Sequence, residues 1–531
     1  MRFTKHLSVA AVAVATVLTI GASADAKTFR YATTGDILGL DPHANNEGPT
    51  NAMKANIYGQ MLHRKPDLTL EPELAVSWER VNDTTWRFKL REGVTFHNGN
   101  AFNADDVVFS FNRQKTSPSM SFALSTLEDL KKIDDFTVEV VTKGPDPILL
   151  LNMPNFYIVD KEYMEANNAV EVTDVAGSTN FANLNANGTG PFKLVEWVQD
   201  NRIVLEPFDK YWNKANMVSN VTKAIFTPIP NNATRVAALL SGEIDLMYPV
   251  PLQDIPRLDA DPNVSVLQGP ELRTIFLGFD QWRDESLDMP GSGKNPFKDV
   301  RVRKAFAHAI DTKAIQRVVM RGASTPTGLM VAPGINGFQE DMNKPYAFNP
   351  DESKKLLAEA GYPNGFPVTL DCPNDRYVND EAICTAVVPM LERVGIKVTL
   401  NAQTKSLHFN KIGKPEGNNT SFFMLGWTPG SYDSYNPLQN LLTMDGEGAG
   451  AWNCGRYSNP EVEKLTAQIV TEVDEAKRNE LIRQAFKIHQ DDVGHIPLHQ
   501  QALAWGISDK TVAEVWQRPF NDVDLRYVTM K

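Results

Sequence analysis

Apolar positions recur along this chain in two rhythms, one typical of strands and one typical of helices. In residues 85–90 (TWRFKL) every second side chain is apolar, which predicts a strand with one buried face. Asn98-Gly99 marks a turn after that unit. Asn103, followed by Asp105, Asp106 and an apolar stripe at helical spacing, predicts a helix that is capped at its start.

Strands and helices keep alternating over the rest of the chain, which indicates an α/β or α+β fold. No repeat of roughly 20–50 residues is present, so a solenoid or a propeller is disfavoured. The further predicted elements are a hairpin over 192–208, a helix from 231 that ends at Gly242, an amphipathic helix over 300–319, a strand–loop–helix unit over 368–388, two helices within 459–493 and a strand over 495–507.

Composition narrows the class of protein. The chain has 531 residues, of which 42% are hydrophobic and 22% charged, as in ordinary globular proteins. At roughly 100–200 residues per domain, this length predicts about three domains. The formal net charge of −12 argues against a nucleic-acid partner, because proteins that bind phosphate backbones carry a basic surface.

The first residues are typical of a secretory signal peptide. Basic residues precede an apolar run of 14 residues, Leu7 to Ile20, and Ala24-Asp25-Ala26 fits a cleavage site, which places the mature N-terminus at Lys27. As a helix this run spans about 21 Å, less than the roughly 30 Å hydrocarbon core of a bilayer. We expect a periplasmic protein without a stable membrane anchor; the alternative is a buried N-terminal helix.

Several short motifs then follow one another in a set order. They are LDP at 40–42, AVSWE at 75–79, TWRFKLREGVTFHNGNAFNADDVVFSFNR at 85–113, GTGPF at 188–192, YW at 211–212, SGEID at 241–245, FKDVRVRKAFAHAID at 297–311 and GW at 426–427. In this order and spacing they resemble the large periplasmic solute-binding proteins that deliver peptides and nickel complexes to ABC importers. The dipeptide- and oligopeptide-binding branch is the most similar.

The resemblance implies a two-lobed α/β periplasmic binding protein with an extra inserted domain, whose lobes close on a ligand in the cleft between them. It also implies a monomer that docks on an inner-membrane ABC permease with cytoplasmic ATPase subunits. The expected boundaries are a signal peptide over 1–26, a first lobe from 27–70, 188–296 and 505–531, an inserted domain over 71–187 and a second lobe over 297–504.

The resemblance also implies two charged anchors for a peptide. In dipeptide-binding relatives an arginine after a strand holds the ligand carboxylate, and Arg376 occupies that position here; the alternative is a surface arginine paired with Asp375 or Asp380. The relatives' aspartate for the ligand amine, in a GW-x-x-Asp motif, is replaced by Gly430. Asp433 is a candidate substitute, or else a loop aspartate that caps the helix near Pro437.

Other ligand contacts are expected around these anchors. Trp427 either stacks on the ligand or belongs to the core behind the cleft, and Thr428 follows it in the same loop. On the opposite wall, Thr34 and Gly35 offer a hydroxyl and a close backbone approach, or else form a structural turn.

Motifs for other chemistry are missing. The sequence holds no HExxH, CxxC, GxSxG, GxGxxG or P-loop motif, and the nine histidines show no spacing typical of metal ligands, so we expect neither catalysis nor a cofactor nor a protein-built metal site. Of the three cysteines, Cys372 and Cys384 could form a disulfide after export, with Cys454 left over. Three buried thiols are the alternative.

We therefore interpret the chain as the substrate-binding component of an ABC importer for short peptides. One alternative keeps the transport role but changes the ligand to an opine, an amino-sugar conjugate or a metal–chelator complex, since Gly430 stands where the aspartate is expected. The other alternative is a periplasmic hydrolase or a chaperone built on the same scaffold.

Overall fold

A computed structural model describes residues 26–173, 179–413, 418–444 and 449–531; the expected signal peptide, apart from Ala26, lies outside these residues. One large mixed sheet runs through the molecule in the strand order β15-β14-β16-β12-β17-β11-β1-β10-β9-β8, and β13 pairs with β17. None of the described helices is long and apolar enough to cross a membrane.

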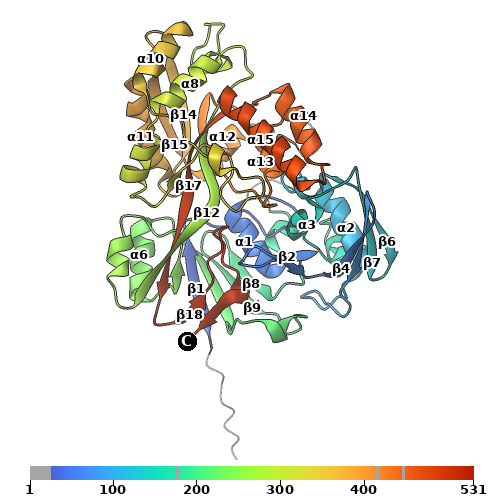
Figure 1. The fold of residues 1–531 in the computed structure, drawn as a ribbon. Coiled ribbons are helices and arrows are strands. Elements are labelled where there is room, and N and C mark those ends of the chain that lie inside the picture. Colours follow the sequence, from blue (N-terminus) through green and yellow to red (C-terminus); the bar gives the residue numbers. More distant parts are fainter. Residues whose placement is uncertain (1–25, 174–178, 414–417, 445–448) are drawn as a thin grey trace, which may run out of the picture.

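Two long strands join the two ends of this sheet (Figure 1). They are β12 (Val264–Phe279) and β17 (His495–Ser508), which pair antiparallel with each other. The first half of β12 pairs with the last half of β17, and its second half also pairs with β16. Their register shifts between Pro270 and Thr274, where the part of the sheet around β1 gives way to the part around β14. We call these two parts the first lobe and the second lobe.

The first lobe is built around β1, which pairs parallel with β10 and β11, and β9 then pairs antiparallel with β10. The chain end returns to this lobe as a two-stranded sheet. Its helix α6 starts after Asn231, whose side chain accepts from the Thr234 amide, and ends at Gly242, which has a positive φ of 78°. The elements are β1 (Thr28–Thr33), α1 (Gly48–Ile57), β8 (Phe192–Val198), β9 (Arg202–Pro207), β10 (Lys223–Pro228), α6 (Asn232–Ser241), β11 (Leu246–Met247), α7 (Ile255–Asp259), β18 (Val512–Val515) and β19 (Val528–Met530).

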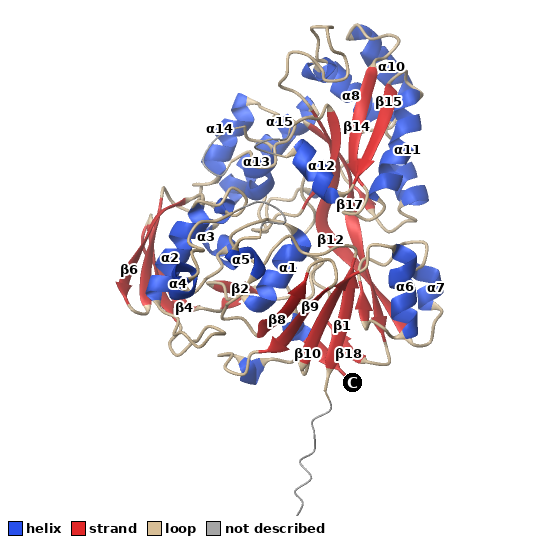
Figure 2. Ribbon diagram, turned by 180° about the vertical axis from the view of Figure 1, so that it is seen from behind, coloured by secondary structure: helices blue, strands red, loops and turns tan. Residues whose placement is uncertain are grey.

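A separate four-stranded sheet, in the order β4-β5-β7-β6, stands beside the first lobe and is covered by α2 (Figure 2). The side chain of Asn103 and that of Asp106 form a capping box at the start of α2, as the sequence predicts for this helix. The elements are β2 (Leu62–Arg64), β3 (Leu70–Pro72), β4 (Ala75–Asn82), β5 (Thr85–Leu90), α2 (Ala104–Lys115), β6 (Leu127–Asp134), β7 (Thr137–Thr142), α3 (Leu149–Asn152), α4 (Lys161–Ala166) and α5 (Phe181–Leu184).

The second lobe packs helices on both faces of β14, β15 and β16 (Figure 2). The single helix expected over 300–319 is interrupted, because Ile310 adopts an extended conformation and Asp311 caps a new turn. The elements are α8 (Val300–Ala309), α9 (Thr312–Ala314), β13 (Thr325–Pro326), α10 (Pro350–Glu359), β14 (Pro367–Pro373), α11 (Asp380–Glu392), β15 (Lys397–Gln403), α12 (Lys405–Ile412), β16 (Phe422–Trp427), α13 (Tyr435–Leu441), α14 (Pro460–Ile469) and α15 (Glu475–Asp492).

Candidate functional site

A cavity of about 1340 Å³ lies between the two lobes. The first lobe contributes residues at the start of α1, the region around the four-stranded sheet contributes 118–122 and 154–157, and the second lobe contributes the ends of β14 and β16 and the start of α12. Ligand sites are typically about 300–1,000 Å³, so this cavity has room for more than a single amino acid. Its walls come from parts of the chain that are far apart in the sequence.

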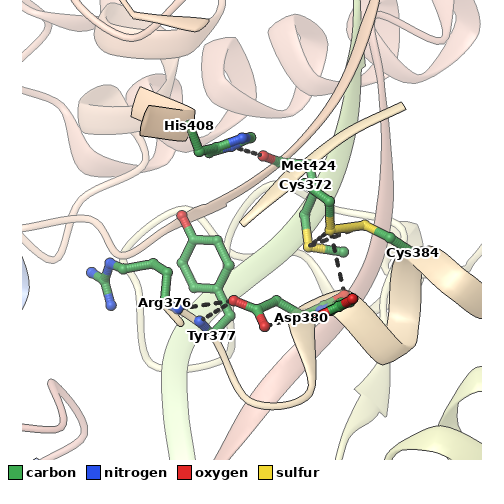
Figure 3. Close-up of a disulfide and its surroundings, with 8 residues drawn as sticks. Cys372, Arg376, Tyr377, Asp380, Cys384, His408 and Met424 are labelled. Atoms are coloured by element: carbon green, nitrogen blue, oxygen red, sulfur yellow. Dashed lines mark hydrogen bonds between the residues drawn. A yellow bond between two sulfur atoms is a disulfide. The ribbon is translucent and has the colours of Figure 1, made fainter. Parts of the chain in front are cut away.

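Arg376 lies on the loop between β14 and α11 and lines the cavity. The loop is fixed from within, because the Asp380 carboxylate accepts from the amides of Arg376 and Tyr377, both at 2.9 Å. Burial raises the pKa of Asp380 to about 6, although these hydrogen bonds act to lower that pKa. The guanidinium of Arg376 is turned away from Asp380, toward the cavity (Figure 3).

A disulfide spans the same loop (Figure 3). Cys372 at the end of β14 and Cys384 in α11 form this bond, with 6.6 Å between their Cα atoms. These are the two cysteines that the sequence offers for pairing, and Cys454 is buried elsewhere in the second lobe. The bond holds the strand and the helix on either side of Arg376 together.

The carboxylate of Glu47 reaches the second lobe from the first. Glu47 is the N-cap of α1 and accepts from the Thr50 amide at 3.1 Å and from its hydroxyl at 3.0 Å. Across the cleft, its Oε1 lies 3.4 Å from Lys405 Nζ and 3.6 Å from Arg376 Nε. Burial alone would raise the pKa of Glu47, but Lys405 and Arg376 outweigh it and hold that pKa below the ordinary value. One carboxylate is therefore shared by two cations of the opposite lobe.

Lys405 and Arg273 complete the cationic end of the cavity. The α12 helix begins at Lys405, whose amide donates to Asp375 Oδ1 at 2.5 Å, and its Nζ also donates to the Asp36 carbonyl at 3.4 Å. Arg273 lies on β12 at the register shift and pairs with the buried Glu271 at 2.8 Å. A carboxylate placed at this end would thus meet three cationic side chains.

Aromatic and small residues form the wall of the second lobe. Trp427 ends β16, lines the cavity and donates from Nε1 to Asn436 at 2.8 Å. Thr428 also lines it, and its buried Oγ1 has no hydrogen-bond partner among the described residues. Gly430 lines it too, and its carbonyl accepts from Asn155 of the opposite side at 3.3 Å.

Arg64, Tyr432 and the C-terminal segment form another part of the cavity wall. The guanidinium of Arg64 lies 3.9 Å from the centre of the Tyr432 ring and donates to two carbonyls. Arg518 pairs with Asp522 at 3.1 Å and with Asp524 at 3.4 Å. The Tyr432 hydroxyl and Asp522 Oδ1 are buried without a hydrogen-bond partner among the described residues.

Three of the residues expected at the ligand lie outside the described cavity wall. Asp433 is completely buried and forms a bidentate ion pair with Arg478, both distances being 2.7 Å, and it accepts from Asn336 and from the Tyr435 amide at the start of α13. This corrects the expectation of an amine anchor, because the carboxylate is already fully used within its own lobe. Thr34 and Gly35 form a turn, in which the Gly35 carbonyl accepts from Thr33, and Gly35 lies beside Lys405.

Other lining residues were not anticipated. Glu47, Arg64, Lys405 and Arg518 belong to no short motif, and their role depends on neighbours far away in the chain. Only the N-cap position of Glu47, two residues before Pro49 at the start of a helix, leaves a local signal.

Outside the cavity, Asp106, Asp160 and Glu162 bring three carboxylates together. Two of them are engaged with amides, since Asp106 accepts from Asn103 and Lys161, and Asp160 accepts from Tyr163 and three asparagine side chains. Burial raises the pKa of Asp106 to about 7. The cluster therefore caps helices α2 and α4.

Comparison with known proteins agrees with this geometry. The family described as bacterial extracellular solute-binding proteins, family 5 (middle), matches residues 69–449. The dipeptide-binding protein of Escherichia coli is 29% identical over 94% of this chain and 92% of its own, and heme-binding protein A of Haemophilus influenzae is 30% identical over 91% and 89%. A periplasmic binding protein from Helicobacter pylori, solved with the peptide STSA, superposes with a TM-score of 0.82 at 24% identity, over 95% of this chain and 98% of its own.

Proposed function

This chain belongs to the bacterial extracellular solute-binding proteins of family 5, with the two-lobed periplasmic binding fold, and we propose that it captures short peptides. The observation that carries the proposal is the position of Arg376, which lines a cavity of about 1340 Å³ between the lobes. A planar guanidinium binds a carboxylate through two hydrogen bonds, and every peptide with a free C-terminus offers one. Trp427 and Thr428 line the same wall and would contact the rest of the peptide.

The transport role follows from the family, in which the binding protein supplies an ABC importer. In our proposal residues 1–26 direct export and are removed, and the mature protein works in the periplasm. The partner is then an inner-membrane permease with cytoplasmic ATPase subunits. Docking depends on the closed form, which the ligand favours by touching both lobes.

Two carboxylates, that of Glu47 and that of the ligand, compete for the cations of the second lobe when the lobes close. Glu47 supplies, from the first lobe, a carboxylate that meets Arg376 and Lys405. A bound peptide brings its own carboxylate to the same end and adds contacts along both walls. A ligand shifts the balance between open and closed forms only through such a difference in affinity for the two.

The direct test is mass spectrometry of the small molecules that leave the purified protein on denaturation. A set of peptide masses is expected. A single non-peptide mass would overturn the peptide ligand and keep the transport role. If an added peptide is recovered cleaved rather than intact, a hydrolase is indicated instead, and suppression of client aggregation without saturable binding of a small ligand would indicate a chaperone.

A second candidate ligand is a non-peptide anion, such as an opine. Gly430 replaces the aspartate expected to hold a peptide amine, and the nearest alternative, Asp433, is committed to Arg478. A ligand without a free ammonium would need no such anchor. The heme-binding protein among the relatives carries the name of a non-peptide ligand at a similar level of identity.

A further inference from the structure

The cations that line the cavity differ in how they are neutralised. Glu47 and Glu271 supply carboxylates for Arg376, Lys405 and Arg273. Arg518 is paired with Asp522 and Asp524. Among the described residues, Arg64 is the lining cation that no carboxylate approaches within ion-pair distance.

Arg64 is nevertheless buried, with 5% of its surface exposed. It is the last residue of β2, and its two terminal nitrogens donate to the carbonyls of Leu68 at 3.1 Å and Leu151 at 3.0 Å. A guanidinium carries five N–H groups, so these two bonds leave about three of them unused. The Tyr432 ring covers one face of the guanidinium at 3.9 Å.

Burying a charge without a counter-charge is unfavourable in free energy, and the pKa of Arg64 reflects this. Burial, together with the nearby Arg518, lowers the pKa of Arg64 to about 10, although the Tyr432 hydroxyl acts in the opposite direction. Tyr432 lines the cavity as well, and its buried hydroxyl has no hydrogen-bond partner among the described residues. Donors that are held in place by backbone carbonyls and an aromatic ring are preorganised for an acceptor from the cavity.

We infer that Arg64 and Tyr432 form a second acidic-group subsite, so that the preferred ligand carries a carboxylate there in addition to the one at Arg376. This inference rests on the proposed function and narrows its substrate class to short peptides with an acidic side chain. Asp522 is paired with Arg518 through Oδ2 at 3.1 Å, which leaves its Oδ1 without a partner among the described residues. A ligand ammonium at Oδ1 would meet the positive charges of Arg518 and Arg64, so the net charge at this part of the wall favours an acidic group.

Matched peptides test the inference on the mature protein after unfolding, removal of bound ligand and refolding. Calorimetric titration compares Ala-Glu with Ala-Gln and Glu-Ala with Gln-Ala, and the same pairs extended to tetrapeptides, because each pair differs in one charge at nearly constant shape. At least one acidic member should bind tenfold or more tightly than its amide. Arg64→Gln should remove that preference while changing the affinity for the amide peptide less than about threefold.

Control variants separate charge from folding. Arg202→Gln removes an exposed arginine paired with Glu196 on the first lobe and should keep the preference. If Arg64→Gln fails to fold by circular dichroism, Arg64→Lys should retain a reduced preference and Tyr432→Phe should weaken the acidic peptide selectively. Equal affinities within every pair in the unaltered protein would overturn the subsite but leave peptide capture standing. No binding of any peptide would overturn the proposed function itself.

Discussion

Two buried carboxylates near the cleft, Asp433 and Glu47, show opposite uses of the same chemical group. Asp433 meets Arg478 of its own lobe through two short contacts of 2.7 Å and is completely buried. Glu47 meets Arg376 and Lys405 of the other lobe at 3.6 and 3.4 Å. A bidentate pair inside one lobe stabilises that lobe. In our proposal, the longer, shared pair across the cleft is exchanged for a ligand carboxylate when the lobes open and close again.

The largest effect is expected on the Asp433 side. Asp433→Asn leaves Arg478 buried without a counter-charge, which should lower the free energy of unfolding by about 3–5 kcal/mol. Urea unfolding measures this. The exposed pair of Asp341 with Arg483 is the matched control, and Asp341→Asn should cost less than about 1 kcal/mol. An Asp433→Asn protein with unchanged stability but lost peptide binding would restore Asp433 as a ligand anchor.

The contact of Glu47 with Arg376 depends on the conformation of the loop that carries Arg376. The Cys372–Cys384 disulfide joins the two ends of this loop. Replacing both Cys372 and Cys384 by serine should lower the free energy of unfolding by about 2–4 kcal/mol, because a closed loop restricts the unfolded chain. Peptide affinity should fall as well, since Arg376 is no longer held between a fixed strand and helix. Adding reductant to the double variant should have no further effect. If affinity is kept, the loop is fixed by Asp380 alone.

Removing Arg376, one of the two cations that share Glu47, should affect ligand binding rather than stability. Arg376→Ala should weaken peptide binding by about 2 kcal/mol, roughly thirtyfold, in calorimetric titration, because the ligand carboxylate loses its guanidinium partner. Arg393→Ala, at the exposed end of α11, serves as the control and should bind normally. Unchanged affinity of Arg376→Ala would remove this residue from the ligand site.

The smallest effect concerns Glu47 itself and depends on pH. Because Lys405 and Arg376 hold the pKa of Glu47 below its ordinary value of 4.5, the bridge contributes fully above pH 4.5 and is lost as the pH falls through the lowered pKa. Solution scattering of the ligand-free protein should therefore show a larger radius of gyration once the pH is below that lowered pKa. Glu47→Gln, which keeps an acceptor for Thr50, should show the larger radius at neutral pH, with a shift in the open–closed balance of about 1 kcal/mol.

A control variant shows whether the change in radius is specific to the Glu47 bridge. Glu196→Gln removes an exposed ion pair on the first lobe and should leave the scattering profile unchanged at every pH. Identical radii for the unaltered protein and Glu47→Gln at neutral pH would show that the bridge does not hold the lobes together.

The sequence by itself determined the local elements, because strand periods and helix caps are encoded by neighbours. The strand over 85–90 is β5, the helix after Asn103 is α2, and α6 ends at Gly242, as expected. It also determined the family, since the order and spacing of the motifs can be recognised in the sequence alone. It could not show that Ile310 would interrupt the helix over 300–319, because the helical stripe continues through that position.

The candidate site was decided by tertiary structure, for a physical reason. The energy of a charged group depends on its partners, and those partners are remote in the chain. Lys405 lies 358 residues from Glu47, and Arg478 lies 45 residues from Asp433. Sequence spacing therefore placed Asp433 beside the ligand, whereas folding buried it against Arg478 and turned Glu47 and Arg64 toward the cavity instead.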